Sequence, residues 1–449
     1  MTTDQHDSGP TVSGEPPARA GHGDVPAPTP AIDLPLLDAN LAGSFGEYAA
    51  AWVKRIRHGD AGILPVLAGL VVIIIIFQTQ NSVFISAGNF ANLLTQASFY
   101  ILFGMAEVFV LLIGEIDLST GYVALCGGAI TAILAGQPHF ESWWLAALAG
   151  LGLCAAIGLV QGLLITRLRL PSFVVTLGGL LAFEGLLLFI LDSWAPSSSG
   201  GDVAISNNVL IDLDSSSGSL SPIAGWIVMA VLVLAFAAFV VTRDRRRRAS
   251  GLVAPPFALS MAKIAAVVVA GIVLVAVCNI DRGPPHGLLI RGVPWCVPII
   301  LAIALAATFL LGWTRFGRYV YAVGGNAEAA RRAGINLNRI RLACFILGSL
   351  MAGMAGLFYV SYTEVATSSA DGGSLVLYAV AAAVIGGTSL FGGRGKIVHA
   401  VLGGLVIAVI YNGMGLLNLS TDVQFMVTAL VLVAAATVDA LGRRGRLSS

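Results

Sequence analysis

The stretch GGNAEAARRAGIN, from Gly324 to Asn336, gathers three charged residues in a chain of which only 11% of residues are charged. Asn326 is a good N-cap, Glu328 suits the positive end of a helix dipole, and Gly334 is a natural helix terminator. The stretch therefore predicts a helix of about eight residues, about 12 Å long at about 1.5 Å per residue. Isolated helices this short are marginal in water, so we expect this one to dock against another surface.

The composition of this short helix suits a docking surface for a soluble partner. Ala329 and Ala330 would present a flat face, while Glu328, Arg331 and Arg332 at the rim would set the register of the partner. The alternative is a structural elbow that lies at the lipid interface.

Four carboxylates lie within or beside apolar stretches: Glu107, Glu115, Asp117 and Glu184. Secondary transporters place titratable residues near the bilayer midplane, which makes these four candidates for an ion or proton site. Asp117 precedes Leu-Ser-Thr and is also typical of an N-cap for a helix that starts there, so a cap and a direct lining or gating role both stay open. A buried carboxylate must be protonated, paired or wet, and the sequence does not identify the partner of Glu184.

A set of neutral polar residues lies at or inside the expected helix ends. Amides and hydroxyls suit a neutral, hydroxyl-rich solute, although such side chains also bond neighbouring helices to one another. Together with two of the carboxylates they form the predicted solute path: Glu115, Asp117, Asn92, Gln96, Thr176, Thr388 and Asn412.

The chain offers no sign of chemistry of its own. No nucleophile–base pair and no metal-ligand spacing occurs, so we predict no catalytic residue and no metal site, and the five isolated cysteines are interpreted as core residues. The run GGRGK at 392–396 is not a Walker A motif, because that motif needs Gly and Ser or Thr where Leu390 and Ile397 stand. The chain is therefore not expected to be an enzyme, and its net charge of +1 suggests no nucleic-acid partner.

The elements that carry these residues are apolar blocks. With 57% hydrophobic residues and a mean hydropathy of +0.87, the chain is predicted to be an all-α polytopic helical membrane protein with about 10–12 transmembrane helices, some short or broken. Twelve blocks could cross the bilayer: 63–78, 91–113, 120–135, 143–165, 172–191, 223–242, 264–279, 295–312, 342–360, 375–390, 398–414 and 423–441.

The positive charges predict the orientation of these crossings. If the N-terminus is cytoplasmic, 23 of the 25 lysines and arginines fall on cytoplasmic segments, and only Arg282 and Arg291 do not. Such sorting follows the positive-inside rule, so both termini are predicted to be cytoplasmic.

The same topology divides the chain into a tail and a membrane domain. Residues 1–50 are predicted to form a disordered cytoplasmic tail, and 51–449 a transmembrane domain. Within that domain we expect a periplasmic loop at 192–221, a basic cytoplasmic loop at 243–263 and a cytoplasmic loop at 313–341 that carries the charged helix.

Several motifs together resemble one family. Glu328-Ala-Ala, followed after three residues by Gly334, resembles the loop by which permeases of bacterial ABC importers contact their ATPases. EIDLSTG at 115–121, LPSFVVTLGGLLAFEGLL at 170–187 and VIGGTSLFGGRG at 384–395 resemble segments of the monosaccharide branch, in particular the xylose permeases.

The resemblance implies a transmembrane permease subunit of an importer in the bacterial inner membrane, carrying a monosaccharide, with a xylose-like pentose favoured. It implies a permease homodimer in the lipid bilayer, an extracytoplasmic sugar-binding protein, and an ATPase subunit with tandem cassettes that binds ATP-Mg; no cofactor is expected on this chain. Family members carry an acidic pair where Val376 and Tyr378 stand here, which weakens the transfer of one particular sugar. A nucleoside, autoinducer or polyol importer is the first alternative, and a proton-coupled secondary carrier is the second.

Overall fold

The structure is a computed structural model of the chain. It describes residues 64–431, 433 and 437, apart from 138–141, 195–200, 216–217, 252–255 and 284–288. The predicted tail at 1–50 lies outside the described residues. The described part is built of helices, together with one short antiparallel pair of strands, β1 (Val203–Ala204) and β2 (Val365–Ala366).

Within the described residues, eight helices are long and apolar enough to cross a membrane. They are α3 (Ala87–Leu112), α5 (Trp143–Arg167), α6 (Ser172–Trp194), α8 (Pro222–Ala249), α9 (Phe257–Cys278), α10 (Cys296–Trp313), α13 (Leu337–Thr363) and α15 (Ile397–Leu416).

Shorter apolar helices complete the set. They are α2 (Leu64–Gln80), α4 (Thr120–Ala135), α14 (Gly372–Ile385) and a helix at Thr421–Val431. Each of the twelve predicted blocks therefore corresponds to an apolar helix, and several are short, which confirms the predicted class of polytopic helical membrane protein.

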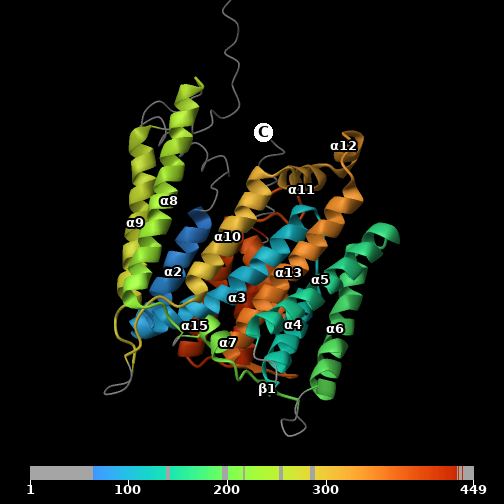
Figure 1. The fold of residues 1–449 in the computed structure, drawn as a ribbon, viewed down its shortest axis with the longest axis horizontal. Coiled ribbons are helices and arrows are strands. Elements are labelled where there is room, and N and C mark those ends of the chain that lie inside the picture. Colours follow the sequence, from blue (N-terminus) through green and yellow to red (C-terminus); the bar gives the residue numbers. More distant parts are fainter. Residues whose placement is uncertain are drawn as a thin grey trace, which may run out of the picture.

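Three further short helices lie at the two ends of the bundle. α11 (Arg315–Gly325) and α12 (Ala327–Arg332) form one end, hereafter the α12 end. α7 (Asn208–Leu213) lies beside the strands at the opposite end, hereafter the β1 end (Figure 1).

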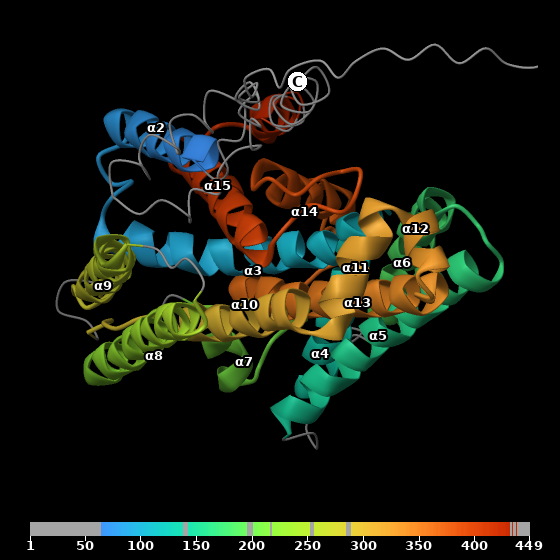
Figure 2. The same cartoon turned by 90° about the horizontal axis from the view of Figure 1, so that it is seen from above.

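Helix α3 forms the centre of the bundle. Every residue from Thr95 to Leu112 is buried, because α13, α15, α14 and α10 pack around this helix (Figure 2). α4, wedged among α5, α6, α13 and α14, is buried at every position except Leu134. Close packing of this kind depends on small residues, because no hydrophobic effect holds helices together in lipid and they must associate through close contact.

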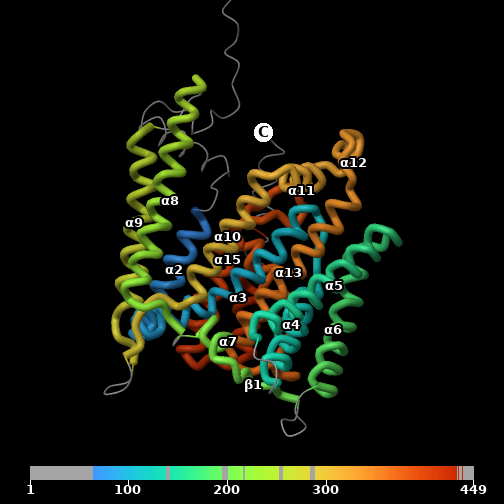
Figure 3. The backbone as a smooth tube through the Cα atoms, viewed as in Figure 1, coloured from blue at the N-terminus to red at the C-terminus, as the bar shows by residue number. Residues whose placement is uncertain are grey.

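The outermost helices flank this bundle on opposite sides. α8 and α9 stand as a pair at one edge and α6 at the other (Figure 3). In the most apolar stretch of α8 only 11% of the residues are buried, against 89% in that of α3. The side chains of α8 therefore have the exposure of a lipid-facing helix.

The regions expected to be loops contain more helix than predicted. Most of 243–263 continues α8 or begins α9, because the arginine run extends α8 to Ala249 with its charges near the negative end of the helix dipole. The region 192–221 contains β1 and α7, and 313–341 contains α11, α12 and the start of α13.

The close contact between α13 and α4 predicts that a larger residue at Gly356 destabilises the protein. A Cβ at Gly356 of α13 would overlap the carbonyl oxygen of Ala124 on α4, whereas a Cβ at Gly152 of α5 meets no other atom. We expect Gly356→Ala to lower the free energy of unfolding by about 1–3 kcal/mol, since overpacking forces the backbone to shift. Gly152→Ala should be neutral or stabilising by up to about 1 kcal/mol, because alanine favours the helix. Thermal unfolding in detergent checks this, and equal melting temperatures would contradict it.

Candidate functional site

The charged stretch forms the predicted helix, α12, with both predicted ends. The Oδ1 of Asn326 accepts a hydrogen bond from the Ala329 amide at 2.9 Å. Gly334 has a φ of +81°, a left-handed conformation that favours glycine, and the Ile335 amide donates to the Ala330 carbonyl at 3.0 Å. The helix is six residues long, two fewer than the sequence predicted.

Both arginines of α12 bind a single carboxylate, that of Glu328. Arg331 donates to both oxygens of Glu328, at 2.8 and 3.0 Å, and the Nε of Arg332 donates to Oε1 at 3.2 Å. These hydrogen bonds hold the pKa of the Glu328 carboxyl below its usual value, and those from Arg331 have the larger effect. All three side chains are exposed, so α12 presents a fixed cluster with a net positive charge.

The two alanines of the predicted flat face point in different directions. Ala330 is buried, with 5% of its surface exposed, and packs against the main core of the bundle. Ala329 is exposed. α12 therefore rests on the rest of the chain through one alanine and offers the other, with its charged neighbours, to whatever lies outside.

A second polar assembly surrounds the interruption between α3 and α4. Residues 113–119 are not helical and are hereafter the broken crossing. Asp117 is buried, and its Oδ1 accepts from the amide of Ser119 at 2.9 Å and from the Ser119 hydroxyl at 2.6 Å. Ser119, not Asp117, occupies the N-cap position of α4, so the carboxylate holds the turn that precedes the helix.

Glu115 lies at the α12 end of this assembly. Its Oε2 accepts from the Ser172 hydroxyl, at the start of α6, at 2.5 Å. Its Oε1 lies 3.2 Å from the Nε of Arg341, in the second turn of α13. Glu115 thus joins three segments that are far apart in the sequence, and the positive charge of Arg341 balances its carboxylate.

Two further side chains complete the polar surroundings of the broken crossing. Glu107, fully buried in α3, shares a 2.7 Å hydrogen bond with the Thr120 hydroxyl through Oε1. Gln161, a lone amide in the apolar α5, donates to the Ser119 hydroxyl at 2.6 Å. Sequence reasoning overlooked Gln161, although an amide inside so apolar a helix signals a polar partner, since an unpaired buried amide is costly.

The predicted amides join helices to one another. Gln96 donates to the Tyr362 hydroxyl at 2.7 Å, and that hydroxyl lies 3.4 Å from the Oδ1 of Asn92, which ties α3 to α13. Asn412 and Asn89 exchange two hydrogen bonds of 2.8 and 3.0 Å, which tie α15 to α3. This geometry favours the helix-bonding role for these residues.

The remaining predicted polar residues are spread over the bundle. The Thr176 hydroxyl of α6 donates to the Ile116 carbonyl of the broken crossing at 3.2 Å. Thr388 is buried between α14 and α15. Glu184 lies beside Tyr122 of α4, a neighbour that the sequence did not reveal.

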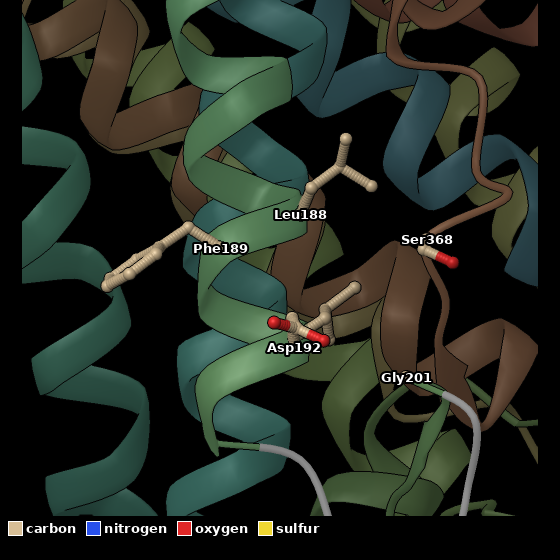
Figure 4. A pocket seen from close by; sticks show the side chains of 6 residues that line it. Leu188, Phe189, Asp192, Gly201 and Ser368 are labelled. Atoms are coloured by element: carbon tan, nitrogen blue, oxygen red, sulfur yellow. The ribbon is translucent and has the colours of Figure 1, made fainter.

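A hollow of about 440 Å³ opens at the β1 end of α6 (Figure 4). Asp192 and Ser368 line it together with apolar side chains of α6. Its lining consists of Leu188, Phe189, Leu191, Asp192, Gly201 and Ser368. Among the residues that the structure describes, no group of three or more His, Cys, Asp or Glu side chains could hold a metal ion.

Long apolar helices packed around a non-helical polar segment are typical of multi-pass membrane proteins that transport solutes. The sequence profile of the family described as the branched-chain amino acid transport system / permease component matches residues 89–436. The chain belongs to this family.

Curated relatives resemble nearly the whole chain. The xylose transport system permease protein of Escherichia coli K12 is 33% identical over 386 residues, which cover 85% of this chain and 92% of the relative. The Haemophilus influenzae protein of the same description is 31% identical over 396 residues, covering 87% and 99%. The ribose import permease protein of Escherichia coli K12 is 30% identical over 373 residues, covering 83% and 92%. No solved structure matches the chain.

The bonding of Asp117 predicts a graded response to substitution. Asn keeps an oxygen that can accept from the Ser119 amide, whereas Leu leaves that buried amide and hydroxyl without their acceptor. Losing such a partner costs about 1–3 kcal/mol, so we expect transport by Asp117→Asn to exceed that by Asp117→Leu at equal membrane levels. Uptake of labelled solute checks this, with Asp202→Leu on an exposed segment as the control. Equal uptake by the two Asp117 variants would remove this residue from the site.

Proposed function

We propose that the chain is the transmembrane subunit of an ATP-driven importer of monosaccharides in the bacterial inner membrane, with a xylose-like pentose as its cargo. The observation that carries the proposal is α12, a six-residue helix at one end of the bundle whose three charged side chains are exposed. In this proposal the α12 end faces the cytoplasm and the β1 end faces outward.

Helix α12 is the proposed docking point of the ATPase. A helix of six residues does not persist in water without support, and the chain supports it on one side only, through Ala330. The exposed side carries Ala329 and the cluster of Glu328, Arg331 and Arg332, which offers a partner both a small contact face and a fixed charge pattern. The partner supplies tandem cassettes and ATP-Mg, and two copies of the permease form the channel.

A monosaccharide is the cargo that the relatives favour, since their descriptions name xylose, ribose and allose. Where an acidic pair stands in the monosaccharide branch, this chain has Val376 and Tyr378, both buried, and Tyr378 packs against Tyr100 and Tyr411. An uncharged, hydroxyl-bearing region suits a neutral solute. A sugar-binding protein would deliver it at the β1 end, where the hollow beside Asp192 and Ser368 opens.

The contacts of three of the four candidate carboxylates support an ATP-driven importer over a proton-coupled carrier. The fourth, Glu107, is buried with only one of its two oxygens bonded, to Thr120. Glu115 is balanced by Arg341, and Glu184 lies beside the Tyr122 side chain. Asp117 holds a backbone turn. Each of these last three carboxylates therefore has a structural reason for its position that does not require proton transport.

The docking proposal predicts the effect of two substitutions. Glu328→Arg would place three cations together, and Gly334→Asp would force a side chain onto a left-handed backbone position and add a charge beside the cluster. We expect either variant to retain less than about a tenth of the bound ATPase, a loss of about 1.4 kcal/mol or more. Glu328→Arg removes the carboxylate that orders Arg331 and Arg332, and Gly334→Asp strains the turn that ends α12. Co-purification of the ATPase with the detergent-solubilised permease measures this. Asp202→Arg, a charge reversal on an exposed segment at the β1 end, is the matched control, and normal ATPase recovery with both α12 variants would refute the docking role.

The cargo is tested by reconstitution of the permease with its ATPase and binding protein in liposomes. We expect labelled D-xylose to enter only with ATP, and collapse of a pH gradient to leave uptake unchanged. Unlabelled ribose and allose serve as competing sugars, and leucine serves as the control suggested by the family description. Uptake that needs a pH gradient and no ATP would establish the secondary carrier instead, and competition by a nucleoside or polyol alone would change the cargo.

A further inference from the structure

The two chain segments that flank α12 meet the same short turn. Before α12, the end of α11 contacts the last residue of α3, and after α12 the second turn of α13 contacts Glu115. Both contacts fall on residues 112–115, hereafter the receiving turn, which includes the first three residues of the broken crossing. α12 is therefore the tip of a hairpin whose two arms rest on one point of the bundle.

The first arm makes a backbone contact that only glycine allows. A Cβ at Gly324 would overlap the carbonyl oxygen of Leu112 and would lie 2.6 Å from the amide nitrogen of Gly393. That amide itself donates to the Leu112 carbonyl at 2.9 Å. The Tyr321 hydroxyl adds a 2.8 Å hydrogen bond to the Gly395 carbonyl. α11, the end of α3 and the turn between α14 and α15 are thus locked together at this point.

The second arm makes an electrostatic contact. The Nε of Arg341 lies 3.2 Å from Glu115 Oε1 without the alignment of a hydrogen bond, and the two side chains are 31% and 16% exposed. A pair this well shielded is screened less by salt than a surface pair. Only the short connection from α12 to Asn336, the N-cap of α13, separates the docking helix from this arm.

From the receiving turn, polar contacts continue to the helices that surround the broken crossing. Glu115 accepts from Ser172 at the start of α6, and Thr176 one turn later donates to the Ile116 carbonyl. Further along, Ser119 accepts from Gln161 of α5. A displacement of the receiving turn would therefore move the broken crossing together with α5 and α6.

We propose that the receiving turn is where movement of α12 enters the membrane domain, and that Glu115 and Arg341 are the positioning residues that carry it. This inference rests on the proposed function, because it requires an ATPase to move α12. The ion pair does not hold the ATPase, which docks on the exposed face of α12. It makes the broken crossing follow α13 when that face is pushed.

The pair is tested by single substitutions and by charge exchange. We expect Glu115→Gln and Arg341→Gln to bind the ATPase as the wild type does, while D-xylose transported per ATP hydrolysed falls at least about fivefold, the lower end of usual coupling factors. The double variant Glu115→Arg with Arg341→Glu should recover part of this loss, although it lacks the acceptor for Ser172. Arg291→Gln, which breaks an ion pair with Asp281 in the segment between α9 and α10, is the matched control.

Each outcome of this experiment decides between the alternatives. Wild-type transport per ATP in both single variants would overturn the inference, as would loss of the bound ATPase in either, since the pair would then serve docking or folding. A wild-type permease that binds no ATPase would instead refute the proposed function. Gel filtration of every variant distinguishes loss of coupling from loss of the fold.

The first arm is tested independently by a pair of adjacent glycines. Gly324→Ala would push α11 away from Leu112, whereas a Cβ at Gly325 meets no atom within 4 Å. We expect Gly324→Ala to lower transport per ATP and Gly325→Ala to leave it unchanged, with equal ATPase binding in both. Equal coupling in the two variants would overturn the role of the receiving turn even if the charge variants did not fold.

Discussion

The broken crossing carries two buried polar side chains, Asp117 and Ser119, and the surrounding architecture depends on meeting their hydrogen-bonding needs. Irregular backbone persists at membrane depth only where protein or a polar cavity meets its hydrogen-bonding needs. Residues 113–119 find those partners on separate helices, through Gln161 of α5, Ser172 and Thr176 of α6, and Arg341 of α13. Replacing any one of these helices by a purely apolar one would leave buried polar groups unpaired.

This requirement also explains why the central helices are so closely packed. A polar contact inside the bilayer needs helices that approach to hydrogen-bond distance, and small residues permit that approach. α3 and α4 are almost wholly buried, while α8 and α9, which lie away from the broken crossing, expose most of their surface. The bundle is thus tight where polar groups must be satisfied and loose where only lipid is met.

The docking helix and the broken crossing are parts of one arrangement. α12 is too short to be stable alone, and its two neighbouring segments both rest on residues 112–115. The contact that supports the helix is therefore also the contact through which a push on it would reach the interior. Only short connections separate α12 from these two contacts, so a displacement of the helix would be passed to residues 112–115.

The sequence by itself determined the helices and their ends. A run of about 20 apolar residues or an N-cap such as Asn326 is a local property, so the twelve apolar segments and both ends of α12 were predictable. The extent of helix at 243–263 was not predictable, because a basic run between two apolar blocks is also typical of a cytoplasmic loop. Only the tertiary structure decided that Glu115 meets Arg341, that Glu184 meets Tyr122 and that Gln161 serves the broken crossing. Those pairings depend on which helix faces which, and no local pattern of residues carries that information.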